Sequence, residues 1–191
     1  MDGPVAFVNA SDGVGVGIAI DGQLLRGAHN SAGEFGHIAL SLDGPICSCG
    51  RKGCWEAYVS VRATISRYDG RDLSWPDSAR PSNTTIAMII ARARSGEKHA
   101  LDTLRETGYY LGRGLATIMK AIEPRRIYMS GEITEAWDLV LPAVQRAMRE
   151  QALIPELTDY EIITVDLGEN PRLLGAAALV TSPAFAAPVV A

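Results

Sequence analysis

The sequence predicts a single α/β domain. Its first part consists of short apolar runs separated by turn residues, and its last part alternates between strand-like and helix-like segments. The chain has 191 residues, of which 47% are hydrophobic and 21% charged, enough for one well-buried core. No internal repeat or linker divides it into two cores. We expect one lobe over residues 1–180, followed by a flexible Pro/Ala-rich tail over residues 181–191.

The first strands are predicted from apolar runs and their turns. Residues 5–9 and 14–20 are apolar and are separated by Ser11-Asp12-Gly13, which is typical of a turn. Asp21-Gly22 follows, and residues 23–25 could begin a third strand. An Asp-Gly pair between apolar runs is a strong hairpin signal. These strands should therefore be antiparallel neighbours.

The middle of the chain begins with a Gly-rich irregular segment and continues with three predicted helices, which form a helical insert over residues 57–122. The helices cover residues 55–68, residues up to about 94 after a cap at Asn83 or Thr84, and residues from about 96 to 122, ended by Pro124. Gly112 and Gly114 lie inside the third helix, where each costs about 1 kcal/mol relative to Ala. Close packing against a neighbour is a plausible reason for both.

The last part of the chain is predicted as alternating strands and helices. The strands cover residues 126–129 and 161–165, and the helices cover residues 134–151 and 171–180. The first of these helices contains Pro142, and the second begins with a proline, as first helical turns often do.

Composition excludes several classes of protein. The net charge of −4 and the lack of a long Lys/Arg cluster argue against direct nucleic-acid binding. No apolar run approaches the roughly 20 residues that cross a bilayer. The first ten residues lack the basic and apolar regions of a secretory signal. We therefore expect a cytoplasmic protein with no membrane partner.

The three cysteines form the sharpest motif. Cys47, Cys49 and Cys54 fall within eight residues, and His37 precedes the first by ten. An odd, tight cluster is a poor disulfide framework, whereas three thiolates and an imidazole suit a structural, tetrahedral zinc site. Three buried small apolar side chains beside an unrelated histidine, or a redox pair at Cys47 and Cys49, remain as alternatives. The predicted metal is zinc, with His37, Cys47, Cys49 and Cys54 as its ligands.

The chain resembles the ROK family (repressor, open reading frame, kinase). Residues 33–37 match its E-x-G-H motif, and residues 47–56 match C-x-C-G-x-x-G-C-x-E. Residues 14–18 resemble its glycine-rich hairpin. The resemblance implies the C-terminal lobe of an actin-like (ribonuclease H-like) ATPase fold, with a zinc-binding loop over residues 33–56.

The resemblance also implies a ligand. Glu34, His37 and Glu56 align with residues that hold sugar hydroxyls, so the expected partner is a sugar or a sugar phosphate. Carboxylates and imidazoles are suited to this because they accept or donate hydrogen bonds to hydroxyls. Taken alone, Glu34 and Glu56 would be interpreted as two solvated surface acids, and it is the neighbouring cysteine motif that favours a role in binding. The family further implies a homo-oligomer, either a dimer or a dimer of dimers.

ROK proteins include sugar kinases and sugar-responsive repressors, and two departures favour the repressors. The kinase phosphate hairpin and catalytic base are expected to precede Met1, and the chain contains no Asn-Asp pair. Ser11-Asp12-Gly13 stands where kinases carry Gly-Thr-Gly, and Ser130-Gly131-Glu132 where they carry Gly-Gly-Gly. Both changes bring a carboxylate toward a phosphate position, which is unfavourable.

We therefore expect the sugar-binding effector region of a ROK-family transcriptional regulator, with no catalytic residue of its own. Its DNA contacts would come only from residues upstream of the chain. The alternative is part of an ATP-dependent sugar kinase of the glucokinase or N-acetylhexosamine kinase type. A third possibility is a remnant that folds around zinc and binds nothing.

Overall fold

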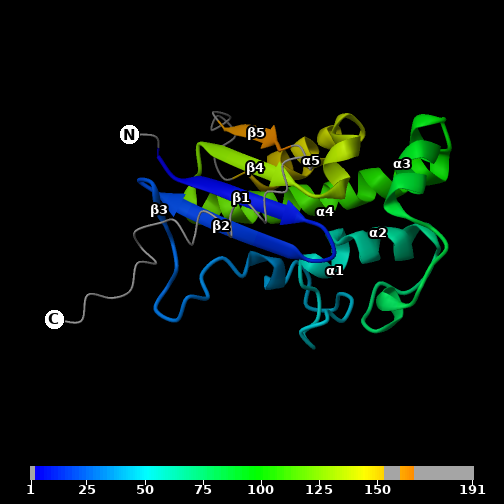
Figure 1. Cartoon of the computed structure of the whole chain (residues 1–191), viewed down its shortest axis with the longest axis horizontal. Helices are drawn as coiled ribbons and strands as arrows, with labels where there is room; N and C mark the ends of the chain where they lie inside the picture. Colours follow the sequence, from blue (N-terminus) through cyan, green and yellow to red (C-terminus); the bar gives the residue numbers. More distant parts are fainter. Residues whose placement is uncertain (1–2, 153–159, 166–191) are drawn as a thin grey trace.

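A five-stranded mixed sheet forms the centre of the protein (Figure 1). The structure, a computed structural model, describes residues 3–152 and 160–165. The strands are β1 (Val5–Ala10), β2 (Val14–Ile20), β3 (Gln23–Leu24), β4 (Arg126–Ser130) and β5 (Glu161–Thr164). Their order is β3-β2-β1-β4-β5. The first three are antiparallel, whereas β4 and β5 run parallel to β1.

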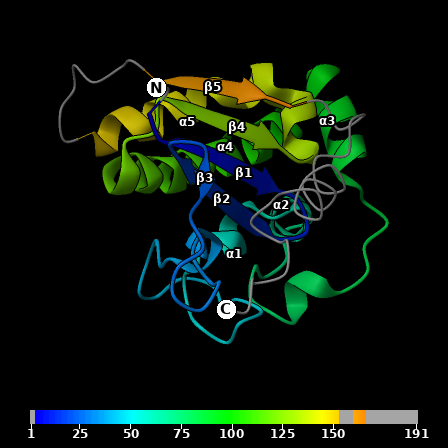
Figure 2. The ribbon, with the colours of Figure 1, turned by 60° about the vertical axis from the view of Figure 1, so that its left-hand side comes forward.

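Five α-helices complete the described fold. They are α1 (Glu56–Val59), α2 (Val61–Tyr68), α3 (Ile86–Arg94), α4 (Lys98–Ile122) and α5 (Trp137–Gln151). Both α4 and α5 lie against the same face of the sheet, while α1 and α2 lie beyond its β2 side (Figures 1 and 2). Short 3₁₀ turns occur at Phe35–His37, Asp77–Ala79 and Glu132–Ala136. This arrangement confirms the predicted mixed α/β class and is consistent with an actin-like lobe.

The core lies between the sheet and α4. Ala6, Val8 and Ala10 alternate with more exposed residues along β1 and are buried together with Leu111 and Leu115 of α4. This alternation is the pattern expected of a strand with one face against a helix layer. The register pairs Val8 of β1 with Met129 of β4, so both parallel strands contribute to the same face.

Glycines allow α4 and α5 to approach closely. A Cβ on Gly108 would meet the backbone oxygen of Val140 at 2.9 Å, and one on Gly112 would overlap the backbone of Val144. The helix therefore tolerates the poor helical propensity of glycine because the interface leaves no room for a methyl group. This is the packing that the sequence predicts for Gly112.

Two predicted helix boundaries were wrong. The segment 55–68 is broken at Ser60, whose extended ψ of 158° ends α1 and whose hydroxyl accepts a hydrogen bond from the Ala63 N–H to cap α2. The N-cap of α3 is Thr85, because its hydroxyl accepts from the Met88 N–H. Thr84 instead donates to Asp69 at 2.9 Å. Serine and threonine side chains compete with the helix for backbone groups, which moves such boundaries by a few residues.

The predicted helix over 171–180 and the predicted tail over 181–191 lie outside the described residues. Within the described part of the chain, none of the helices is long and apolar enough to span a bilayer.

Candidate functional site

The Cys/His loop, residues 33–56, runs from the end of the β-hairpin to α1. It has little regular structure, but isolated bridges join Ala39 to Cys54 and Ile46 to Lys52. The Cys47 N–H donates to the Arg51 carbonyl at 2.8 Å, which closes a tight turn around Cys49. Gly53 adopts a φ of 68° and lies against the Ser41 backbone, so no other residue fits there.

The loop brings the four predicted metal ligands together. One ligand atom from each of His37, Cys47, Cys49 and Cys54 lies within 4.8 Å of the others. The Sγ atoms of Cys49 and Cys54 are 3.7 Å apart, as are Cys47 Sγ and His37 Nδ1. Sulfurs about 2.3 Å from a tetrahedral zinc ion would be about 3.8 Å from one another. The donor set and its spacing therefore fit a structural zinc ion.

The pKa values of Cys49 and Cys54 are shifted in opposite directions. Burial, helped by a hydrogen bond with Cys49, raises the pKa of Cys54 to about 12. The pKa of Cys49 is lowered, chiefly by the hydrogen bond from the Arg51 backbone N–H. Cys49 is exposed, whereas Cys47 and Cys54 are buried. A divalent cation would hold all three as thiolates, because coordination deprotonates a thiol outright.

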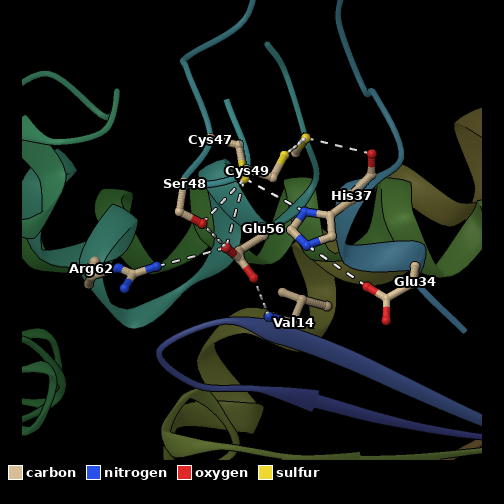
Figure 3. A network of polar contacts seen from close by, with 9 residues as sticks. Val14, Glu34, His37, Cys47, Ser48, Cys49, Glu56 and Arg62 are labelled. Atoms are coloured by element: carbon tan, nitrogen blue, oxygen red, sulfur yellow. Dashed lines mark hydrogen bonds and ion pairs between the residues drawn. The ribbon is translucent and has the colours of Figure 1, made fainter. Parts of the chain in front are cut away.

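Of the candidate sugar residues, His37 belongs to this cluster and Glu34 lies beside it (Figure 3). His37 directs Nδ1 toward Cys47 and Nε2 toward Glu34, whose Oε2 is 3.9 Å away. A carboxylate near the second ring nitrogen is the usual partner of a metal-binding histidine, since it fixes the ring orientation. The Glu34 side chain is 69% exposed, so most of its carboxylate remains open to a ligand.

Glu56, the third candidate, is only 12% exposed and is held by three segments. Its Oε2 accepts from the Val14 N–H at 3.1 Å, at the start of β2. Its Oε1 accepts from the Ser48 hydroxyl at 3.2 Å and lies 3.8 Å from Nη2 of Arg62. Glu56 therefore joins the β1–β2 turn, the Cys/His loop and α2. The motif drew attention to Glu56, but nothing in the sequence pointed to Ser48 or Arg62.

A second group of polar residues lies where β1 and β4 end. Ser11 Oγ donates to Glu132 Oε1 at 3.0 Å, and Ser130 Oγ donates to Asn9 Oδ1 at 2.9 Å. Within the described residues, the buried Oε2 atom of Glu132 has no hydrogen-bond partner. The turn after β1 and the segment after β4, which both differ from the kinase motifs, are thus in direct contact.

Comparison with known proteins places these features in a family. The fold and the Cys/His loop define a mixed α/β lobe with a cluster of side chains that could hold a metal ion, and the ROK family model matches residues 4–182. The chain belongs to the ROK family.

The similar proteins include both a repressor and a kinase. The chain is 30% identical to the xylose repressor of Bacillus subtilis, over 92% of this chain and 44% of the repressor. It is 31% identical to a glucokinase of Streptomyces coelicolor, over 94% of this chain and 60% of the glucokinase. The chain thus spans about half the length of these relatives.

A solved structure shares the fold as well. The ROK family glucokinase of Streptomyces griseus, in complex with glucose and AMPPNP, matches with a TM-score of 0.76 and 29% identity. The match covers 92% of this chain and 60% of that one. The relatives of this ROK chain therefore include both repressors and sugar kinases.

Proposed function

We propose that the chain is the sugar-binding effector region of a ROK-family transcriptional regulator. The observation that carries this proposal is the hydrogen bond between Ser11 and Glu132. This hydrogen bond holds a protein carboxylate between the β1–β2 turn and the end of β4. In the kinases that the chain resembles, we expect the nucleotide to bind at this place. DNA contacts would come from residues outside the chain.

Electrostatics at this turn oppose a phosphate group. Two like charges about 4 Å apart repel by roughly 1 to 4 kcal/mol, depending on the local dielectric. Glu132 bonds to Ser11 on one side of the turn, and Glu56 accepts the Val14 N–H on the other. Asp12 adds a third carboxylate within the turn itself. A phosphate would therefore have to displace protein carboxylates from the donors that it needs.

The sugar site that we propose consists of Glu34, His37 and Glu56. Glu34 offers an open carboxylate, and His37 holds it near the cluster. A zinc ion on His37, Cys47, Cys49 and Cys54 would serve a structural role, because four protein ligands leave no open coordination position. It would fix the segments that carry the sugar-binding side chains relative to one another.

The second candidate function is part of an ATP-dependent sugar kinase. The similarity to glucokinases supports it, since one of them was solved with glucose and AMPPNP bound to the same fold. It would require Glu132 to leave Ser11 when nucleotide binds.

Calorimetry with AMPPNP, and melting temperature with glucose or xylose, test these alternatives. An effector region should melt at a higher temperature with one of the sugars, since a ligand that binds only the folded state stabilises it. It should show no saturable binding of Mg²⁺-AMPPNP. Nucleotide binding by the unaltered chain would favour the kinase instead. No response to either sugar would contradict the proposed sugar site for these two ligands.

A further inference from the structure

Arg62, at the start of α2, lies between Glu56 and an aromatic ring. Its Nη2 is 3.8 Å from Glu56 Oε1, and its guanidinium carbon is 5.4 Å from the centroid of the Trp75 ring. The Arg62 side chain is 33% exposed, and Glu56 is 12% exposed. A guanidinium above an indole face loses little hydration and is restricted in its rotamers, which favours one fixed direction toward the carboxylate.

Trp75 is itself held against the Cys/His loop. The backbone N–H of Trp75 donates to the Ile46 carbonyl at 2.7 Å, and the backbone N–H of Ile46 donates to Ser74 Oγ at 3.1 Å. Ile46 immediately precedes Cys47. The segment between α2 and α3 is therefore fastened to the loop at the residue next to a candidate metal ligand, and this places the Trp75 ring beneath Arg62.

Three groups from two segments meet at one oxygen of Glu56. The Cys47 thiol lies 3.8 Å from Oε1 as a hydrogen-bond donor, and the Ser48 hydroxyl donates to the same oxygen at 3.2 Å. Among the described residues, Arg62 is the cation paired with Glu56. The direction of the carboxylate therefore depends on contacts with both the Cys/His loop and α2.

The space between Arg62, Glu56 and Trp75 is small. A cavity of about 10 Å³ lies among these groups, lined by residues that include Ser48, Glu56, Arg62 and Trp75. This is room for about one water molecule and not for a substituent of a sugar. On this side Arg62 therefore meets the Glu56 carboxylate rather than a ligand.

We propose that Arg62, supported by Trp75, is a positioning residue that orients the Glu56 carboxylate for sugar hydroxyls. This inference rests on the proposed function. It adds the segment between α2 and α3 to the determinants of the sugar site, through the contacts of Trp75 with Arg62 and with the Cys/His loop.

The test is calorimetric affinity for glucose and xylose, measured on the zinc-loaded chain. Arg62→Ala should weaken binding of the sugar that the unaltered chain binds by about tenfold, and Arg62→Lys, which keeps the charge, should recover part of it. Trp75→Ala should reproduce part of the loss. In a Glu56→Gln background, Arg62→Ala should have little further effect, because the group that it orients has already lost its charge.

The chain provides a matched control. Arg92 lies 5.5 Å above the Tyr68 ring and 4.0 Å from Glu97, the same combination of arginine, carboxylate and ring, away from the candidate site. Arg92→Ala should change stability to a similar extent and leave sugar affinity unchanged. Elemental analysis and melting temperature show whether each variant retains its metal and its fold, and Arg62→Gln replaces Arg62→Ala if the latter does not fold.

The possible outcomes distinguish the positioning role of Arg62 from the proposed sugar site itself. Normal sugar affinity in folded Arg62→Ala would overturn the role of Arg62 and leave the sugar site intact. An equal loss in the Glu56→Gln background would also overturn it, since Arg62 would then act independently of Glu56. Failure of the unaltered chain to bind either sugar would overturn the proposed site for these ligands, and the inference with it.

Discussion

The indole ring of Trp55 lies directly against Gly114 of α4, in the space that a Cβ on Gly114 would occupy. Trp55 is fully buried, and its Nε1 donates to the Tyr110 carbonyl of the same helix at 3.0 Å. Because Trp55 stands between Cys54 and Glu56, this contact fixes both the Cys/His cluster and the candidate sugar site relative to the core.

Gly114→Ala should therefore destabilise the protein. In an unconstrained helix the change would gain about 1 kcal/mol, since alanine is the better helix former. Here the methyl group would displace Trp55, and overpacking of a filled core costs roughly 1 to 3 kcal/mol. Chemical denaturation should show a net loss. Gly15→Ala is the control, because Gly15 has no heavy atom within 4 Å of its would-be Cβ. A more stable Gly114→Ala variant would contradict this packing.

The Cys/His cluster yields a second prediction. Cys49→Ala should release the bound zinc and unfold at least the Cys/His loop, because metal binding energy at such a site is also local folding energy. Elemental analysis of the purified chain should find about one zinc per chain before the change and little after it. Hydrogen exchange should show lost protection over residues 33–55.

Ser48→Ala is the matched control for Cys49→Ala. It alters the neighbouring residue and removes a hydrogen bond to Glu56, yet it leaves all four predicted ligands in place. It should keep its zinc. An unchanged metal content in Cys49→Ala would contradict the ligand set.

The sequence was sufficient to predict the strands and the cluster because both depend on local patterns. The alternation of β1 and the Asp-Gly turn after β2 are short-range signals, and the spacing of Cys47, Cys49 and Cys54 predicted a grouping that the structure confirms. The break at Ser60 was missed, because a helical apolar pattern continues through it while the hydroxyl caps the next helix.

Contacts between distant segments could not be predicted in the same way. Ser11 and Glu132 are 121 residues apart, and they meet only because β1 and β4 are parallel neighbours whose carboxyl ends share one edge of the sheet. The stacking of Arg62 on Trp75 depends equally on how the segment between α2 and α3 returns to Ile46. Neither pair has a spacing that marks it in a single sequence.

A third prediction concerns the contact between Ser11 and Glu132. Ser11→Ala removes the donor to Oε1, and Oε2 already lacks a described partner. A carboxylate left without its hydrogen bond costs about 1 to 3 kcal/mol, so denaturation should show a loss in this range. In a Glu132→Ala background the same substitution should cost less. Equal costs in both backgrounds would mean that the two side chains are not coupled.

The last prediction separates sugar binding from metal binding. Glu34→Gln keeps the size of the side chain and removes its charge, and Glu34 is not a predicted metal ligand. Hydrogen bonds to a charged group contribute roughly 1.5 to 3 kcal/mol, so calorimetric affinity for the bound sugar should fall by about tenfold or more. The zinc content should remain unchanged. Glu135→Gln, at an exposed position on the 3₁₀ turn before α5, is the control and should bind as the unaltered chain does. Equal affinity of the Glu34→Gln variant would remove Glu34 from the sugar site, whereas loss of zinc would show that the carboxylate is needed to hold His37 in its metal-binding orientation.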